Sequence, residues 1–226
     1  MKIKNLILPA FLLFAVSCTK TKDNGSATPS ESYLNTATGS TWNYHVIDSS
    51  GTTPIASDYT ITSTSRDTTI SGKSYHIYDN STGGFQYLNK TGTDYYQFDS
   101  LPAGFGVGVF ERLYLKDSAY AGTSWNQTQN VTVSGIPFAI PVILTYSIAE
   151  RDISRTVNSV NYSNVIHVTA SISSPLIPST SLSSSINSYY APIYGLIESS
   201  TKISLNYSGL VENVNVSLKL VNSVLK

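Results

Sequence analysis

The segment Val214–Leu220, with the sequence VNVSLKL, alternates apolar and polar side chains without a break. Successive side chains of a β-strand point to opposite faces of the sheet, so this period of two predicts a strand with one buried and one solvated face. Strands of this kind are typical of antiparallel sheets. The segment therefore predicts an all-β fold built on an antiparallel sheet.

The same alternation recurs along the chain, in the segments Thr41–Val46, Tyr59–Thr62, Leu144–Ile148 and Ile203–Ser208. Short runs rich in Gly, Asn and Ser separate such segments, and Gly and Asn supply the positive φ angles that tight hairpins need. Residues 18–226 show no helical period that extends over three turns. We therefore predict roughly a dozen strands, arranged as a curved antiparallel sheet, a half-barrel or a barrel.

One pattern occurs twice in the chain, and each copy contains one of the two tryptophans. The pentapeptides Gly39–Asn43 and Gly122–Asn126 both read Gly, two Ser or Thr residues, Trp and Asn. The matched aromatic positions are Trp42 with Trp125, Tyr59 with Tyr146, and Tyr75 with Tyr162. The two matched tyrosines are 16 residues apart in both copies. We predict two similar tandem halves, residues 33–120 and 121–226, in one continuous sheet or as two domains.

The first residues of the chain have a different character. Lys2 and Lys4 precede Leu6–Val16, an apolar run of 11 residues. This run is shorter than the roughly 20 residues that span a bilayer. Its length and its positive flank fit the apolar region of a secretory signal peptide.

The end of that run, Ala15-Val16-Ser17-Cys18, resembles the lipobox of bacterial lipoproteins, in which small residues precede a cysteine. The resemblance implies cleavage between Ser17 and Cys18, so that residues 1–17 are a signal peptide. It also implies acylation of Cys18, with palmitate as one expected acyl chain. Two or more acyl chains hold a protein stably on a membrane, so the membrane is an expected partner.

Residues 18–32 follow the expected cleavage point and show no apolar period. Their Ser, Thr, Lys and Gly content predicts a flexible tether between the lipid and the folded domain. In lipoprotein sorting, an aspartate directly after the acylated cysteine resembles an inner-membrane retention signal, and this chain has Thr19 there. The expected location is the cell envelope, with a lipid anchor in the outer membrane, on its periplasmic or its surface side.

A second resemblance lies late in the chain, where Tyr190–Ile197 reads YAPIYGLI. Together with the two Gly-x-x-Trp sequences, this segment resembles a group of uncharacterised bacterial envelope lipoproteins with a Tyr-Ala-Pro-x-x-Gly motif. The resemblance covers Gly39–Glu198 and implies an all-β protein with a curved sheet. It supplies no catalytic residues.

The charge of the chain narrows the choice of partners. The full sequence has 14 basic and 14 acidic residues, and loss of residues 1–17 removes two lysines. The remaining 209 of the 226 residues then carry 12 basic and 14 acidic side chains, a net charge of −2. Because nucleic acids require basic patches, we expect no nucleic-acid partner.

The sequence contains no recognisable catalytic or metal-binding motif. The histidines His45, His76 and His167 lie far apart and without a cysteine at ligand spacing, so we expect no metal and no other cofactor. No Gly-x-Ser-x-Gly sequence occurs, and nothing fixes a pair of carboxylates for glycoside hydrolysis. The expected role is non-catalytic binding or scaffolding. The alternative of a hydrolase would need a carboxylate pair or a histidine-centred cluster in a cleft.

Two features suggest ligands for a binding role. Exposed aromatic rings stack on sugars, so a glycan-binding surface could use tyrosines that would otherwise pack in the core. These tyrosines are Tyr95, Tyr96, Tyr189, Tyr190 and Tyr194. The apolar segment Val131–Leu144, which contains Ile136–Ile143, is either a core strand or a flap. A half-barrel with an apolar lining could carry an acyl ligand. The expected partner is thus a glycan, an apolar ligand or another protein.

Overall fold

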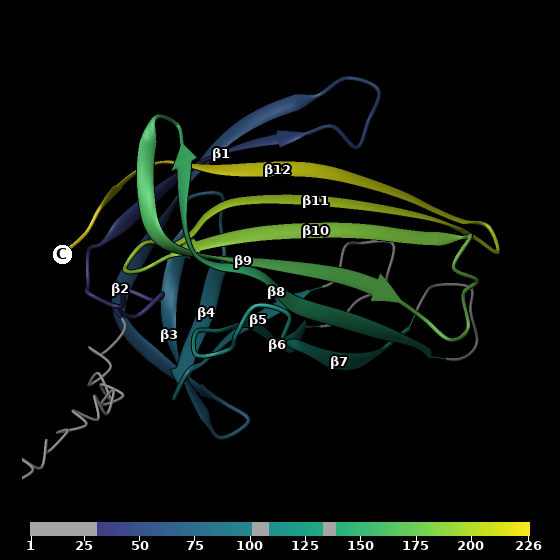
Figure 1. The fold of residues 1–226 in the computed structure, drawn as a ribbon, viewed down its shortest axis with the longest axis horizontal. Coiled ribbons are helices and arrows are strands. Elements are labelled where there is room, and N and C mark those ends of the chain that lie inside the picture. The colour runs from purple at the N-terminus through teal and green to yellow at the C-terminus, as the bar shows by residue number, and fades with distance from the viewer. Residues whose placement is uncertain (1–30, 101–108, 133–138) are drawn as a thin grey trace, which may run out of the picture. The chain divides into compact units, whose positions relative to one another are not determined.

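The computed structural model describes residues 31–100, 109–132 and 139–226, and within these residues twelve strands form one antiparallel sheet without helices (Figure 1). The strands are β1 (Thr41–Asp48), β2 (Ile55–Ile70), β3 (Lys73–Asn80), β4 (Phe85–Thr91), β5 (Asp94–Ser100), β6 (Val109–Lys116), β7 (Ser124–Val131), β8 (Ile140–Val157), β9 (Val160–Ser173), β10 (Leu182–Ala191), β11 (Gly195–Tyr207) and β12 (Leu210–Val224). The predicted all-β class, the antiparallel pairing and the number of strands are confirmed. The segment VNVSLKL lies in β12, where Leu220 is fully buried and Lys219 is exposed.

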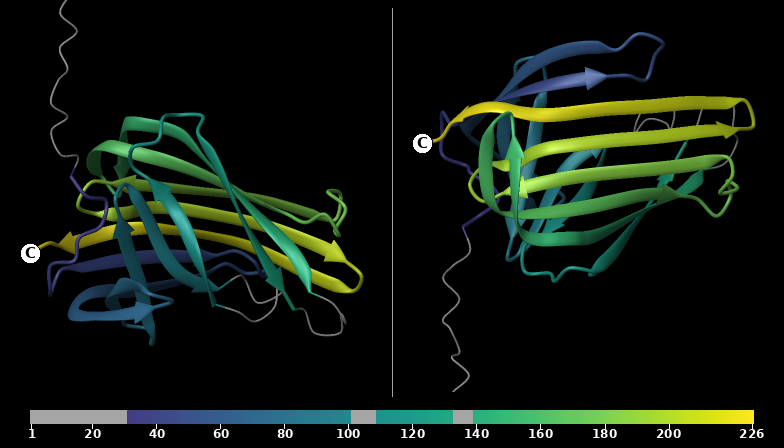
Figure 2. Two further views of the ribbon diagram at one scale, coloured as in Figure 1. Left: turned by 90° about the horizontal axis from the view of Figure 1, so that it is seen from below. Right: turned by 45° about the horizontal axis from the view of Figure 1, so that its top comes forward.

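The sheet consists of two six-stranded meanders joined edge to edge. Its strand order is β6-β5-β4-β3-β2-β1-β12-β11-β10-β9-β8-β7, so the first strand of one meander pairs with the last strand of the other. In this central pair, Thr41 lies opposite Val224 and Asp48 lies opposite Val216. The sheet curls into a nearly closed barrel, which brings the edge strands β6 and β7 into contact (Figure 2). Residues of both predicted halves thus belong to one sheet.

Side chains bridge the two edge strands. Gln127 of β7 accepts a hydrogen bond from the amide of Leu113 (2.8 Å) and donates one to the carbonyl of Glu111 (3.2 Å). The indole of Trp125 donates to the carbonyl of Leu113 (2.9 Å). A glutamine side chain carries the same donor and acceptor types as a peptide group. Gln127 therefore satisfies the edge of β6 as a neighbouring strand would.

Replacing Gln127 with alanine is expected to lower the free energy of unfolding by about 1–3 kcal/mol, because two peptide groups of β6 lose their partner. Asn126→Ala, at an exposed position of the same strand, should change it by less than about 0.5 kcal/mol. Urea unfolding of both variants measures the difference. If Gln127→Ala were as stable as the wild type, the closure of the barrel would not depend on this side chain.

Both Gly-x-x-Trp sequences make the same turn. Gly39 and Gly122 have φ angles of 83° and 86°, a region that strains any residue with a Cβ atom. The amide of Gly39 donates to the carbonyl of Ser63 (2.9 Å), and the amide of Gly122 donates to the carbonyl of Ile148 (2.7 Å). The two tryptophan strands therefore begin in the same way, with a left-handed glycine bonded to the next strand.

The observed pairing of the strands changes which residues of the two predicted repeats correspond. Trp42 lies opposite Ile61, whereas Trp125 lies opposite Tyr146. By position relative to the tryptophans, Tyr146 therefore corresponds to Ile61, and its sequence match with Tyr59 is displaced by two residues. The pairing of β2 with β3 and that of β8 with β9 both contain register irregularities, which accommodate this displacement of two residues.

Beyond these irregularities the two copies are in step again. Tyr75 and Tyr162 are each the third residue of a strand, β3 and β9, and each strand follows a two-residue turn. Both tyrosines are buried. These shared features are those that a structural duplication would produce, and the duplication itself stays a prediction.

The apolar faces of the strands form the core of the barrel. Every second residue from Ile140 to Ile148 in β8 is buried, and the residues between them are only partly buried. Within the segment Val131–Leu144, Val131 ends β7, residues 140–144 belong to β8, and residues 133–138 lie outside the described ranges.

Candidate functional site

A cavity of about 370 Å³ lies inside the barrel. Its lining residues come from strands β1–β6 and β10–β12, from residues 33–35 and from Tyr194. Eight of these residues are aromatic, seven are polar or charged, and six are aliphatic. The barrel is therefore only partly filled by its own side chains, and the remaining volume falls in the range of about 300–1,000 Å³ that is typical of small-molecule pockets.

Aromatic rings form the part of the wall that strands β1, β2 and β3 contribute. Trp42 packs edge-on against Tyr78, with ring centroids 5.9 Å apart. Tyr44 stacks on Tyr59 with a centroid distance of 5.3 Å. Because the rings pack on one another, they present flat apolar surfaces to the cavity in fixed orientations.

Polar side chains reach the cavity from two other parts of the sheet. They are Gln86, Gln97 and Arg112 from β4, β5 and β6, and Ser188, Ser199 and Thr201 from β10 and β11. Arg112 donates a hydrogen bond to Gln97 (2.9 Å), and among the described lining residues it alone carries a charge. Amide and hydroxyl groups both donate and accept hydrogen bonds, so most of this polar lining can bind either kind of partner.

The chain segment before β1 forms part of the cavity wall, and we call residues 32–35 the N-terminal strap. The carbonyl of Ser32 accepts a hydrogen bond from the amide of Ile193 (2.7 Å). The hydroxyl of Tyr78 donates to the carbonyl of Asn35 (2.8 Å). The strap is thus bonded at both of its ends to the barrel that it helps to close.

Tyr33, at the middle of the strap, is 4% exposed and bonded to two distant parts of the barrel. Its amide donates to the hydroxyl of Tyr95 (3.1 Å), and its own hydroxyl donates to the carbonyl of Asn164 (2.7 Å). The Tyr95 hydroxyl donates in turn to the buried carboxylate of Asp117 (2.7 Å), which lies 3.6 Å from Nζ of Lys90. Burial raises the pKa of the Tyr33 hydroxyl to about 12, so it is a neutral donor at ordinary pH.

Three of the five tyrosines considered for sugar binding lie in or near the cavity. Tyr95 and Tyr190 are buried and pack against Tyr114, with centroid distances of 6.2 and 5.4 Å. Tyr190 and Tyr194 line the cavity, and Tyr194 packs edge-on against Tyr162 (5.1 Å). These rings therefore face the interior rather than an outer binding surface.

The other two tyrosines are covered by neighbouring side chains. Nζ of Lys73 lies 3.3 Å from the ring centre of Tyr96. Tyr189 stacks on His167 at 4.2 Å, and the guanidinium of Arg155 lies 4.0 Å from the ring centre of Tyr189. The five tyrosines thus do not share one exposed surface on which a sugar could stack.

Each of the three histidines lies opposite an acidic residue of the neighbouring strand. The pairs are His45 with Asp58 (2.6 Å), His76 with Asp67 (2.7 Å) and His167 with Glu150 (3.0 Å). Sequence spacing did not reveal these pairs, because cross-strand neighbours depend on the register of two strands. An assumed hairpin register around the turn at residues 71–72 could have pointed to the second pair.

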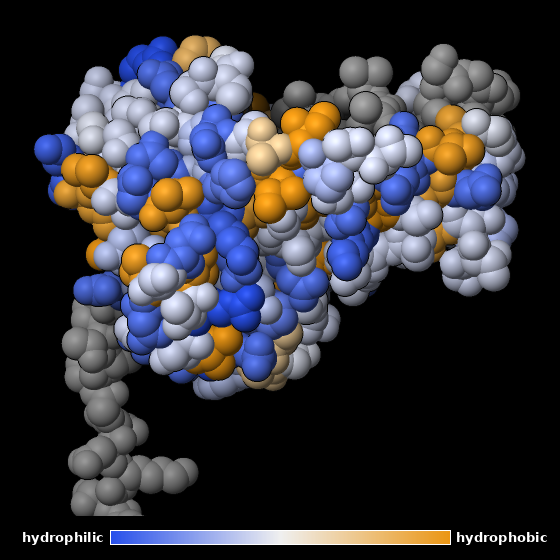
Figure 3. All heavy atoms as spheres, turned by 90° about the horizontal axis from the view of Figure 1, so that it is seen from above, coloured by the Kyte–Doolittle hydropathy of each residue, from blue (hydrophilic) through white to orange (hydrophobic). Residues whose placement is uncertain are grey.

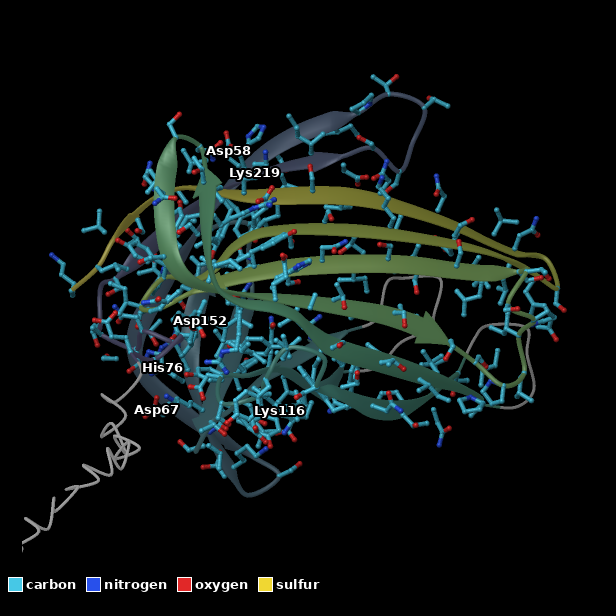
Figure 4. All side chains as sticks on the ribbon, viewed as in Figure 1. Asp58, Asp67, His76, Lys116, Asp152 and Lys219 are labelled. Atoms are coloured by element: carbon cyan, nitrogen blue, oxygen red, sulfur yellow. The ribbon has the colours of Figure 1, made fainter. Side chains whose placement is uncertain are left out.

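One of these pairs continues to a serine. Nδ1 of His76 lies 2.7 Å from Asp67, and both residues are labelled in Figure 4. Nε2 of His76 lies 2.9 Å from Oγ of Ser63. This is the order of groups in the triad of serine hydrolases. Ser63 is only 1% exposed, however, and it is not among the residues that line the barrel cavity. The array therefore has the hydrogen bonds of a triad but no access for a substrate to the hydroxyl.

The rest of the described structure offers no comparable site. In residues 31–100, 109–132 and 139–226, no three His, Cys, Asp or Glu side chains gather as a metal site would require. The same ranges contain no helix with the length and apolarity needed to cross a membrane. On the face drawn in Figure 3, hydrophobic residues are dispersed among hydrophilic ones. The cavity is thus the best-defined candidate for a binding site.

Several predictions from the sequence fall outside the described ranges. They are the signal peptide at residues 1–17, the cleavage site between Ser17 and Cys18, and the acylation of Cys18. Of the tether at residues 18–32, the structure describes only residues 31 and 32. These statements stay predictions.

No protein-family model matches the chain, and a comparison with curated proteins finds no relative. Among solved structures, the chain is similar to a "putative lipoprotein" from Parabacteroides distasonis, with 11% identity and a TM-score of 0.42. It is also similar to a "putative exported protein" with a YMCC-like fold from Bacteroides fragilis, with 7% identity and a TM-score of 0.41. Both matches cover 86% of this chain and 99% of the other. These scores are too low to support an inference about fold or function.

Proposed function

We propose that this chain is a lipid-anchored, non-catalytic protein of the cell envelope whose barrel binds a small ligand. The observation that supports the binding role is the cavity of about 370 Å³ with its aromatic and polar lining. The lipobox-like sequence Ala15–Cys18 supports the anchor, and Thr19 supports the outer membrane as its location. The net charge of −2 expected after removal of residues 1–17 argues against nucleic acid as a partner.

A ligand inside the barrel agrees with the structure better than a glycan platform on its surface. The rings of Tyr96 and Tyr189 are covered by basic or imidazole side chains, and Tyr95 and Tyr190 are buried. A platform needs coplanar, uncovered rings, whereas an interior site needs only a lined volume with a few polar groups. The alternative role as a carrier requires a lined cavity, and the cavity in the barrel supports it.

Filling the cavity tests the binding role. The wild-type barrel should gain thermal stability from at least one compound of a broad library of small metabolites, because a ligand that binds only the folded state raises its stability. Ser199→Phe, which places a ring in the cavity, should lose this gain while keeping the circular dichroism of the wild type. Ser204→Phe, at an exposed position of the same strand, is the control and should keep the gain. A library without any stabilising compound would contradict a small-molecule role.

Cys18→Ala is expected to move the protein from the membrane fraction to the soluble fraction, because it removes the residue that the lipobox would acylate. Metabolic labelling with palmitate should mark the wild type and leave Cys18→Ala unlabelled, since alanine has no thiol to acylate. Ser17→Ala, which keeps a small residue before the cysteine, is the control and should retain the label. An unlabelled wild type would refute the anchor.

Ser63 is expected to remain unlabelled by a fluorophosphonate probe, because its hydroxyl is 1% exposed in the folded protein. The probe reacts only with a serine that a base activates and that solvent can reach. In-gel detection of the probe on wild type and Ser63→Ala makes the comparison. Labelling of the wild type that Ser63→Ala abolishes would contradict the non-catalytic role and favour a hydrolase.

A further inference from the structure

We propose that the ligand of the barrel cavity is a neutral sugar, a pyranose of one or two rings. This inference rests on the proposed binding function and adds the chemical class of the ligand. A pyranose offers C–H faces that pack on aromatic rings and hydroxyl groups that both donate and accept hydrogen bonds. The cavity contains partners for both kinds of surface.

The aromatic partners lie on two sides of the cavity. Trp42, Tyr44 and Tyr59 belong to β1 and β2, and Tyr114 and Tyr190 belong to β6 and β10. Rings of the first group pack on aromatic neighbours, as do Tyr114 and Tyr190 on each other, so each ring keeps its orientation without a ligand. A ring compound such as a pyranose can therefore bind against side chains that are already ordered, at a small entropic cost.

The polar partners are uncharged and available. Gln86, Ser188, Ser199 and Thr201 line the cavity, and their side chains form no hydrogen bond with other described residues. All four are amide or hydroxyl groups, which can donate to one sugar hydroxyl and accept from another. A carboxylate on a ligand could only accept hydrogen bonds from these groups, and an ammonium group on a ligand could only donate to them.

The charge distribution of the lining also favours a neutral ligand. Within the described lining residues no carboxylate is present to bind a cation, and the guanidinium of Arg112 already donates to Gln97. The hydroxyls of Tyr44 and Tyr114 are neutral, because burial raises their pKa well above the ordinary value. The wall thus consists mainly of neutral dipoles, which suit hydroxyl groups.

An acyl chain fits the same lining less well. Seven of the lining side chains are polar or charged, and methylene groups would displace their water without offering hydrogen bonds in return. Leaving a polar group without a partner costs about 1–3 kcal/mol in proteins. A sugar of similar size removes the same water and replaces its hydrogen bonds.

Trp42 lines the cavity and can report binding, while Trp125 belongs to the edge strand β7 and does not line it. Because the indole of Trp125 bridges β6 and β7, we would keep both tryptophans and assign a fluorescence change on ligand addition to Trp42. The probes are D-glucose, D-galactose, N-acetyl-D-glucosamine and cellobiose as neutral sugars, and cis-parinaric acid as an acyl ligand. Gln86→Leu removes one polar lining group, and Gln129→Leu makes the same change on β7, outside the cavity.

At least one of the four sugars should change the fluorescence of Trp42 in a saturable way. Gln86→Leu should weaken its binding about tenfold, the loss expected for one or two hydrogen bonds, and Gln129→Leu should leave it within about twofold. Binding of cis-parinaric acid but of no sugar would overturn the sugar class and keep the binding function. Absence of binding by all five probes would also overturn the sugar class, and the metabolite library would then decide whether the cavity binds anything.

Discussion

Tyr33→Ala is expected to lower the free energy of unfolding by about 3–5 kcal/mol, the usual loss for a large buried aromatic side chain. The ring of Tyr33 is 4% exposed and packs edge-on against Tyr95 with a centroid distance of 6.3 Å. The substitution also removes the hydrogen bond to the carbonyl of Asn164. Because Tyr33 holds the strap against the barrel, amide hydrogens of residues 32–38 should exchange faster with solvent as well.

Two further variants separate the contributions of the ring and the hydroxyl. Tyr33→Phe keeps the ring and should lose only about 1–2 kcal/mol, since it removes one hydrogen bond to a buried carbonyl. Tyr120→Ala, which truncates a tyrosine that is 79% exposed, should be close to neutral. Denaturant unfolding and hydrogen exchange of the three variants give the comparison. Equal losses for Tyr33→Ala and Tyr120→Ala would show that the strap adds nothing to the stability of the barrel.

The second large effect is expected at alkaline pH, where the barrel should unfold as its tyrosines ionise. Burial raises the pKa of Tyr33 and Tyr59 from 10.0 to about 12, and it also raises the pKa values of Tyr44, Tyr78 and Tyr114 above the ordinary value. A group whose pKa is higher in the folded state gives its full stabilisation below its unfolded pKa and loses it as the pH rises. The contribution of these tyrosines to stability should therefore be constant up to about pH 10 and fall steeply above it.

For Tyr33 alone, the rise of its pKa corresponds to about 3 kcal/mol of stability, lost between pH 10 and 12. Tyr59 and other buried tyrosines add to this loss, so the fall should be comparable with the total stability of a typical domain, about 5–15 kcal/mol. Urea unfolding at a series of pH values, together with tyrosinate absorbance, measures it. Tyr33→Phe should show a shallower fall. Unchanged stability up to pH 12 would mean that the tyrosines ionise without disturbing the fold.

Local patterns in the sequence predict much of the barrel. Alternation in segments such as VNVSLKL identifies the strands and their buried faces, because side-chain direction repeats every two residues wherever a strand forms. The glycines of the two Gly-x-x-Trp sequences identify the turns that start β1 and β7. Both signals arise within a few residues of chain, so no knowledge of the partner strand is needed.

The candidate site was much harder to predict. The five tyrosines are divided between the interior and the outer surface, because Tyr95 and Tyr96, and likewise Tyr189 and Tyr190, are consecutive residues of a strand and point to opposite faces. The sequence alone did not show which member of each pair faces the interior. Tyr189 and Tyr190 are consecutive residues of β10, so one ring lies outside against His167 and the other lies inside against Tyr114. The polar lining residues, such as Gln86 and Thr201, were missed because strand glutamines and threonines carry no local signal of facing a cavity.

The sequence by itself therefore determined the all-β class, the strands, their antiparallel pairing and the expectation of an acylated Cys18. The tertiary structure decided how the sheet closes, what fills it and which side chains meet. Gln127 bridges strands β6 and β7, and Tyr33 bonds to Asn164 across 131 positions of sequence. Such contacts depend on the curvature and register of the whole sheet, and a periodic pattern within single strands does not specify either quantity.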